Sequence, residues 1–141
     1  MPELFYRIDE VTRIADILLQ EAKNCTVFTF TGTLGAGKTT LVQTMLRACG
    51  VTGLITSPTF TYVNVYHNRQ GMTFYHFDCY RIHSLNEFIH AGFAEYVYAP
   101  NSISFIEWPE IIMPLLDHKV CHIQLEYHEQ TMRQLKYTIK N

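Results

Sequence analysis

Long apolar runs are missing from this sequence of 141 residues. No segment is apolar over the roughly 18 residues that a membrane-spanning helix needs. The first residues also lack the basic segment and apolar run that mark a secretory signal. We therefore expect a cytoplasmic protein that has no contact with a membrane.

Paired cysteines are missing too. The four cysteines, Cys25, Cys49, Cys79 and Cys121, are widely spaced and form no CxxC pair. A structural zinc site needs cysteine or histidine ligands at short, regular spacings, which these residues do not offer. We expect reduced, mostly buried thiols.

Basic residues are scarce. Eleven Lys and Arg stand against thirteen Asp and Glu, which gives a formal net charge of -2 at pH 7. This balance lacks the positive field with which most independent nucleic-acid-binding proteins attract a phosphate backbone. We expect no DNA partner, and we expect any contact with RNA to be made through a partner protein.

The composition is that of a folded chain. Hydrophobic residues make up 48% of it and charged residues only 17%, enough apolar surface to build a core. The length suits about one domain, and no internal repeat or linker divides it. We predict a single domain over residues 1–141.

Helical and strand-like patterns alternate along the chain. Apolar residues at three- and four-residue spacing indicate helices, whereas β-branched runs or alternating apolar residues indicate strands. In chain order the predicted elements are a helix over 9–23 with Asp9 as its N-cap, a strand over 26–31, a helix over 39–49, a hairpin of strands over 59–67 and 72–80, a helix over 86–99 interrupted at Gly92, a central strand over 102–106, and two half-buried strands around a turn near Glu129. We predict an α/β fold with a mixed, partly antiparallel sheet.

A glycine-rich segment joins the first predicted strand to the helix that follows. Residues 32–39 read GTLGAGKT and fit the phosphate-binding pattern GxxxxGK[ST]. Glycines let successive backbone N–H groups turn toward phosphate oxygens, and the helix directs its positive end at them. In this pattern Lys38 reaches the β- and γ-phosphates, and the Thr39 hydroxyl binds Mg²⁺. The sequence predicts a nucleotide site, and a glycine-rich turn without a ligand is the alternative.

Two other classes of nucleotide-binding protein lack their signatures. A GTPase normally carries NKxD and DxxG motifs, yet no Asn is followed by Lys and no Asp has Gly three residues later. A small-molecule kinase needs a cationic lid for its second substrate, whereas the six arginines are scattered singly. ATP is therefore favoured over GTP, and a metabolite substrate has no signature.

An acidic residue ends the predicted central strand. Glu107 follows the apolar run over 102–106 and precedes Trp108, at a position where a second ligand of Mg²⁺ is expected. A surface carboxylate at the end of a strand is the alternative.

A second acidic residue, Asp78, lies between His76 and Tyr80 on one face of the predicted strand over 72–80. A carboxylate in this setting can orient an attacking water or bind hydrated Mg²⁺. A salt bridge with Arg81 on an edge strand is the alternative.

A neutral segment, SPTFTY over 57–62, has the order along the chain that a nucleotide-sensing switch would have. In that role Thr59 would meet the γ-phosphate or Mg²⁺. The start of an ordinary strand is the alternative.

Four segments taken together resemble the TsaE (YjeE) family, the ATPase of bacterial tRNA threonylcarbamoyladenosine synthesis. They are GTLGAGKTT over 32–40, SPTFTYVNVY over 57–66, HFDCYR over 76–81 and IEW over 106–108, in the family's order and spacing. The resemblance implies a P-loop NTPase-type, three-layer domain that binds ATP and Mg²⁺. It also implies TsaD and TsaB as partners, which act after TsaC has made the threonylcarbamoyl-adenylate, with tRNA contacted only through the complex. A nucleotide-dependent binding switch whose hydrolysis is incidental stays open as an alternative function.

The resemblance also implies roles for single residues. The catalytic residues are Asp78, Glu107 and Lys38; the nucleotide is bound by Gly35, Ala36, Gly37, Lys38, Thr39, Thr40, Asp9, Thr59, Trp108 and Arg133; and Mg²⁺ is bound by Thr39, or Thr40, together with Glu107. In this set Asp9, beside Ile8, and Arg133 belong to the adenine side. One departure is visible, because the family's paired glutamates after the HFDCYR segment are reduced to Glu87 and Glu95.

Overall fold

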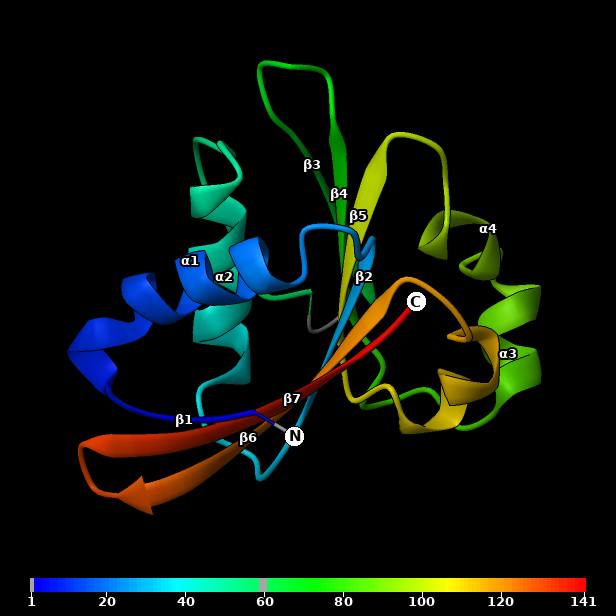
Figure 1. The fold of residues 1–141 in the computed structure, drawn as a ribbon. Coiled ribbons are helices and arrows are strands. Elements are labelled where there is room, and N and C mark those ends of the chain that lie inside the picture. The colour runs from blue at the N-terminus through cyan, green and yellow to red at the C-terminus, as the bar shows by residue number, and fades with distance from the viewer. Residues whose placement is uncertain (1, 59–60) are drawn as a thin grey trace.

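A seven-stranded sheet separates two groups of helices within residues 2–58 and 61–141, the part of the chain that this computed structural model describes (Figure 1). The strands are β1 (Glu3–Arg7), β2 (Val27–Thr31), β3 (Val63–His67), β4 (Thr73–Asp78), β5 (Ser102–Glu107), β6 (Val120–Glu129) and β7 (Met132–Lys140). The α-helices are α1 (Val11–Glu21), α2 (Lys38–Ala48), α3 (Leu85–His90) and α4 (Ala94–Val97), and two 3₁₀ helices are η1 (Ile8–Glu10) and η2 (Glu110–Leu115). The predicted α/β fold with three layers is confirmed.

The sheet is parallel in its middle and antiparallel at both sides. Its strand order is β1-β7-β6-β2-β5-β4-β3. The pairs β2–β6, β2–β5 and β4–β5 are parallel, whereas β1–β7, β6–β7 and β3–β4 are antiparallel. Because parallel strands all run the same way, the carboxyl ends of β2, β4 and β5 meet at one edge, where ligands of such sheets bind.

Helices cover both faces of the parallel strands. On one face, Ile14 and Leu18 of α1 and Leu41 and Met45 of α2 are fully buried against the sheet. On the other face lies α3 (Figure 1). Its Phe88 belongs to a second apolar cluster that includes Ile112 of η2. This double cover explains why β2 and β5 are near-continuous apolar runs rather than alternating patterns.

The predicted helices and strands are confirmed to within a few residues, but three details are wrong. Asp9 is not an N-cap, because η1 precedes α1 and Glu10 occupies the N-cap position of α1. Strand β4 ends at Asp78, so Tyr80 does not continue its face. Nor is β4 an edge strand, because it lies between β3 and β5.

Strand β1 was not predicted. Its sequence, ELFYR, is apolar at three consecutive positions, which hides the alternation of a strand that is buried only at Tyr6. It forms by pairing with β7 from the far end of the chain.

The cysteines agree with the prediction of mostly buried thiols. All four cysteines are free, and all but Cys49 are buried. Among the described helices, none is long and apolar enough to cross a membrane.

Candidate functional site

The glycine-rich loop begins where β2 meets the backbone of β6. A Cβ atom on Gly32 would lie 1.8 Å from the carbonyl oxygen of Leu125, and the φ of Gly32 is +134°. At the other end of the loop, Gly37 has a φ of +104° and is the N-cap of α2. Both positions need glycine, because other residues rarely adopt these angles and a side chain on Gly32 has no space.

Two side chains of the β6–β7 hairpin hold the outer side of the loop. The Tyr127 hydroxyl donates to the carbonyl oxygen of Gly35 at 2.7 Å, and Nε of Arg133 donates to that of Ala36 at 3.1 Å. The Arg133 guanidinium also lies 4.2 Å from the centre of the Tyr127 ring. Because a trans peptide directs its N–H opposite its carbonyl, the N–H of Gly37 is turned to the inner side of the loop.

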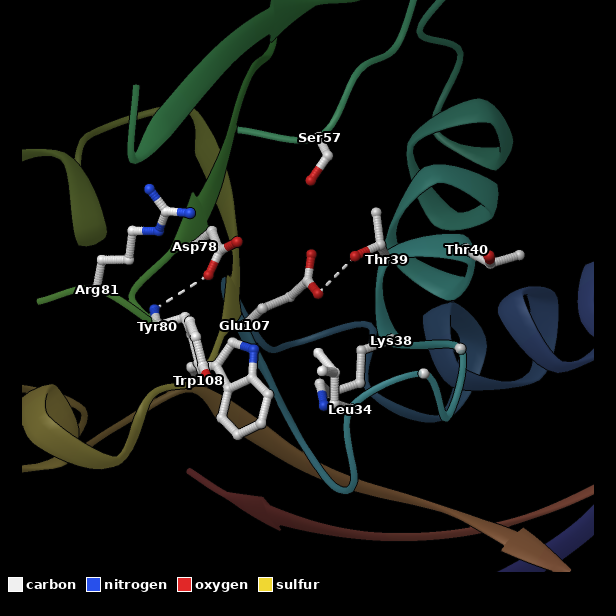
Figure 2. Close-up of a pocket in the computed structure, with 12 residues that line it drawn as sticks. Leu34, Lys38, Thr39, Thr40, Ser57, Asp78, Tyr80, Arg81, Glu107 and Trp108 are labelled. Atoms are coloured by element: carbon white, nitrogen blue, oxygen red, sulfur yellow. Dashed lines mark hydrogen bonds between the residues drawn. The ribbon is translucent and has the colours of Figure 1, made fainter. Parts of the chain in front are cut away.

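On that inner side lies an open cavity of about 410 Å³ at the carboxyl ends of the parallel strands (Figure 2). Its acidic residues come from β4 and β5, in which Asp78 and Glu107 are direct neighbours in the register. The cavity is lined by Leu34, Gly35, Gly37, Lys38, Thr39, Thr40, Ser57, Asp78, Tyr80, Arg81, Glu107 and Trp108. The fold therefore brings together the loop, the predicted acids and Trp108. The first and last of these, Gly32 and Trp108, are 76 positions apart in the chain.

Glu107 is buried and bonded through both carboxylate oxygens. Its Oε1 accepts from the Thr39 hydroxyl at 2.7 Å, and its Oε2 lies 2.6 Å from Nε2 of His76. His76 is fully buried, and its Nδ1 has no hydrogen-bond partner among the described residues. The alternative of a surface carboxylate does not hold, because Glu107 is only 3% exposed.

Lys38 points back to its own loop. Its Nζ donates to the carbonyl oxygens of Gly32, at 2.5 Å, and of Thr33, at 3.2 Å, and lies 4.0 Å from the centre of the Trp108 ring. Burial lowers the pKa of Lys38, and the nearby Glu107 carboxylate opposes this shift. An anion in the cavity would therefore compete with carbonyl dipoles and an aromatic face for this ammonium group.

Trp108 is held at the mouth of the cavity in an unusual backbone conformation. Its φ is +55°, in the left-handed region that bulky residues rarely adopt. Its ring packs against Tyr80, with 4.8 Å between the ring centres. This turn lets the indole lie over Lys38 directly after β5 has ended.

Asp78 is only partly buried and faces Glu107. Burial raises the pKa of the Asp78 carboxyl, and the nearby Glu107 charge raises it further. The backbone N–H of Tyr80, which donates to Oδ1 at 3.0 Å, lowers this pKa and so opposes the shift. A carboxylate with a raised pKa is a better proton acceptor near neutral pH than an ordinary one.

A second, smaller cavity of about 150 Å³ lies on the other side of the loop. Tyr6, Ile8 and Val11 give it an apolar wall, and Arg133 also lines it. The two cavities share Gly35, Gly37 and Thr40. Asp9 is not among the residues that line it, because its exposed carboxylate is directed to Arg7 at 3.5 Å.

The oxygen atoms of Thr39 and Glu107 fit a divalent cation such as Mg²⁺, which prefers hydroxyl and carboxylate ligands. They already lie at hydrogen-bond distance from one another at the floor of the larger cavity. Thr40 points away from Glu107, along the opposite side of α2 (Figure 2). Thr59, the remaining predicted nucleotide contact, lies outside the described residues.

A family model described as "Threonylcarbamoyl adenosine biosynthesis protein TsaE" matches residues 6–135. The chain belongs to the TsaE family. Among its relatives, the TsaE protein of Haemophilus influenzae is 34% identical over 92% of this chain and 81% of its own length. The TsaE protein of Bacillus subtilis is 31% identical over 92% of this chain and 80% of its own length. The Synechocystis TsaE protein is 43% identical over 66% of this chain, which spans only 60% of that relative.

The fold is that of a solved structure. The crystal structure of Bacillus subtilis YdiB superposes with a TM-score of 0.72 at 26% identity, covering 99% of this chain and 87% of YdiB. The fold that carries the site in this TsaE-family chain is therefore shared with a solved structure.

Sequence reasoning missed several residues of this TsaE-family site. His76 had a visible signal, because it lies two positions before Asp78 and so on the same face of the strand. Tyr127 had none, since it is a half-exposed aromatic near the end of β6. Tyr6 could have been predicted as a site residue only if β1 had been recognised as a strand.

Proposed function

We propose that this chain binds ATP with Mg²⁺ and hydrolyses it as the component that threonylcarbamoyladenosine formation in tRNA requires, acting with TsaD and TsaB. The observation that carries the proposal is the convergence of Lys38, Thr39, Asp78 and Glu107 on one cavity in a chain of the TsaE family. A lysine, a hydroxyl and two carboxylates around a glycine-rich loop at a helix N-terminus are the parts that phosphoryl transfer from a nucleotide needs.

In this proposal the phosphates lie on the inner side of the loop. The backbone N–H groups from Gly35 to Thr40 and the ammonium group of Lys38 bind them, and Lys38 leaves its loop carbonyls to do so. The Thr39 hydroxyl and the Glu107 carboxylate hold Mg²⁺, which when bound supplies positive charge against the phosphate oxygens.

Asp78 takes the proton of the attacking water. Its carboxyl faces the same cavity, and burial raises its pKa toward the range in which a carboxylate accepts a proton effectively. The water oxygen then bonds to the γ-phosphorus as the bond to the β–γ bridging oxygen breaks, which releases ADP and phosphate. Trp108, at the mouth, limits access of further water.

The adenine base occupies the smaller cavity. The side chains of Tyr6, Ile8 and Val11 offer an apolar wall for its ring, and the shared loop joins this cavity to the phosphate side. Arg133 lines this cavity and also donates a hydrogen bond to the carbonyl oxygen of Ala36. It therefore contacts the base and holds the loop. In this proposal Asp9 lies near the base but does not line the cavity that binds it.

A net charge of -2 suits a protein that meets tRNA only through its partners. Four free cysteines suit the reducing cytoplasm, where we place the protein. The test is ATP turnover by the purified protein with Mg²⁺, alone and then with TsaD, TsaB and substrate tRNA. Stimulation by the partners, and its loss in Lys38→Ala and Glu107→Ala, is the expected result; full activity of both variants in tRNA modification would contradict the proposal.

One observation favours a second function, a binding switch whose hydrolysis is incidental. Leu34 and Tyr80 line the cavity and are 72% and 61% exposed, so apolar surface surrounds the nucleotide where a partner could cover it. A variant that binds ATP without hydrolysing it separates the two functions. Repeated modification cycles by such a variant would favour the switch, whereas arrest after one cycle would favour the ATPase.

A further inference from the structure

We infer that His76 is a positioning residue that holds the Glu107 carboxylate in the orientation in which it can bind Mg²⁺. The inference rests on the proposed function, because it assigns a role to His76 in the cation site of that function. It depends on the hydrogen-bond geometry between β4 and β5.

The register of the sheet places His76 beside Glu107. His76 is opposite Phe105 in the parallel β4–β5 pair, and Glu107 is two residues further along the same face of β5. The imidazole therefore reaches diagonally along the sheet, and Nε2 comes within 2.6 Å of Oε2. Both side chains are almost entirely removed from solvent, at 0% and 4% exposure.

The direction of this hydrogen bond follows from the acceptor. A carboxylate oxygen can only accept, so Nε2 carries the hydrogen and donates it. The other ring nitrogen, Nδ1, is buried without a hydrogen-bond partner among the described residues. A buried polar group without a partner is costly, and its presence here indicates that the site is arranged for the bond from Nε2.

The bond becomes more important when a cation is bound. In this structure Glu107 has two hydrogen bonds, one from Thr39 and one from His76. A cation held by the Thr39 hydroxyl and the Glu107 carboxylate uses the two oxygen atoms that form the first bond. Of these two hydrogen bonds, the one from His76 is then left to orient the carboxylate, in the way that outer partners orient metal ligands generally.

Two substitutions that both introduce a side-chain amide distinguish this role from a role in packing. In His76→Gln the side-chain amide nitrogen can occupy the place of Nε2, whereas in His76→Asn it reaches only the place of Nδ1, which has no partner. Both replace the ring with an amide, so a loss of packing affects both. A loss of the Nε2 donor affects only His76→Asn.

The experiment measures binding of Mn²⁺, as a probe for Mg²⁺, to each variant together with a non-hydrolysable ATP analogue, followed by ATP turnover with the partners. We expect His76→Asn to weaken Mn²⁺ binding about tenfold or more and to lower kcat, with nucleotide affinity in EDTA unchanged. His76→Gln is expected to stay within about threefold of the wild type in Mn²⁺ binding.

A double-mutant cycle with Glu107→Gln completes the test. If His76 acts through Glu107, His76→Asn adds little to the loss of Mn²⁺ binding that Glu107→Gln alone causes. Additive losses, wild-type Mn²⁺ binding in His76→Asn, or a His76→Gln variant as weak as Glu107→Gln would each overturn the inference. Should His76→Asn not fold, the Mn²⁺ affinity of His76→Gln decides alone.

The two proposals fail in different ways. A wild-type protein that binds neither nucleotide nor Mn²⁺ and shows no turnover with the partners would overturn the proposed function, and the inference with it. If the wild type binds nucleotide and Mn²⁺ and turns over ATP with the partners, but His76→Asn binds Mn²⁺ with the same affinity as the wild type, only the inference is overturned.

Discussion

The two cavities that meet at the glycine-rich loop differ in size, in chemistry and in origin. The larger, of about 410 Å³, contains two carboxylates and a lysine and lies at the ends of the parallel strands. The smaller, of about 150 Å³, has an apolar wall from β1, η1 and α1, at the antiparallel side of the sheet. Three loop residues, Gly35, Gly37 and Thr40, belong to both. Charge is thus concentrated on one side of a single loop and apolar contact on the other.

Under the proposed function, this difference assigns the phosphates to the larger cavity and the base to the smaller one. Phosphates need donors and cations, which the larger cavity supplies, whereas a base gains from burial against apolar side chains. Removing a group from one cavity should therefore affect one part of the nucleotide, and removing the loop should affect both.

The largest effect is expected in the larger cavity, from Lys38→Ala. Losing the ammonium group should lower ATP turnover at least about 100-fold, the loss typical of removing one group that stabilises developing charge. Steady-state kinetics with Mg²⁺ and the partner proteins measure it. Lys23→Ala, which removes the same charge from an exposed turn, is the control and should match the wild type. Turnover within threefold of the wild type in Lys38→Ala would show that the cavities do not divide the nucleotide in this way.

Gly32→Ala should damage the loop that both cavities share. The new Cβ would meet the Leu125 carbonyl, in addition to the cost of the positive φ, so we expect a loss of more than about 3 kcal/mol in the free energy of unfolding. Gly53→Ala is the matched control, because its φ is +83° but nothing lies within 4 Å of a Cβ there. That control should lose only about 1–2 kcal/mol, the cost of the left-handed backbone alone. Urea unfolding compares them, and equal losses would contradict the clash.

Val11→Trp should fill the smaller cavity and leave the larger one intact. We expect ATP to bind about tenfold more weakly, a loss of about 1.4 kcal/mol, with tripolyphosphate binding unchanged because it has no base. Calorimetric titration of both ligands measures this. Val65→Trp, at a half-exposed position on β3, serves as the control. An equal loss for both ligands would mean that the smaller cavity does not bind the base.

The smallest effect on stability is expected from Asp78→Asn, which should stabilise the fold slightly. The same substitution removes the proposed proton acceptor and should lower ATP turnover. Because burial raises the pKa of Asp78, its charged form costs stability above that pKa, and the cost disappears as pH falls toward the ordinary value of about 4. The asparagine still accepts from the Tyr80 N–H. We expect Tm to rise by about 2–4 °C near pH 8, with no difference near pH 4.

Thermal unfolding across this pH range checks the Asp78 prediction. Asp16→Asn, on an exposed face of α1, is the control and should leave Tm unchanged. A gain in Tm that is the same at every pH would contradict an electrostatic origin in the larger cavity.

The larger cavity could be predicted from the sequence far better than the smaller one. Its loop follows β2 directly, and Asp78 and Glu107 are the last residues of β4 and β5. Parallel strands bring such positions to one edge of the sheet. The smaller cavity depends on β1, which pairs with β7 from the other end of the chain. No local pattern in residues 3–7 encodes that pairing, so Tyr6 and Val11 were not predicted as site residues. Of the neighbouring residues Ile8 and Asp9, which the resemblance places on the adenine side, Ile8 lines this cavity.

The pairing of β1 with β7 also has a consequence for how the protein is made. On the ribosome, residues 3–7 emerge early but must wait for residues 132–140 before they can pair. The acids of the larger cavity and the loop are synthesised well before that. The apolar wall that Tyr6 of β1 gives to the smaller cavity therefore cannot be complete until β7 has been made.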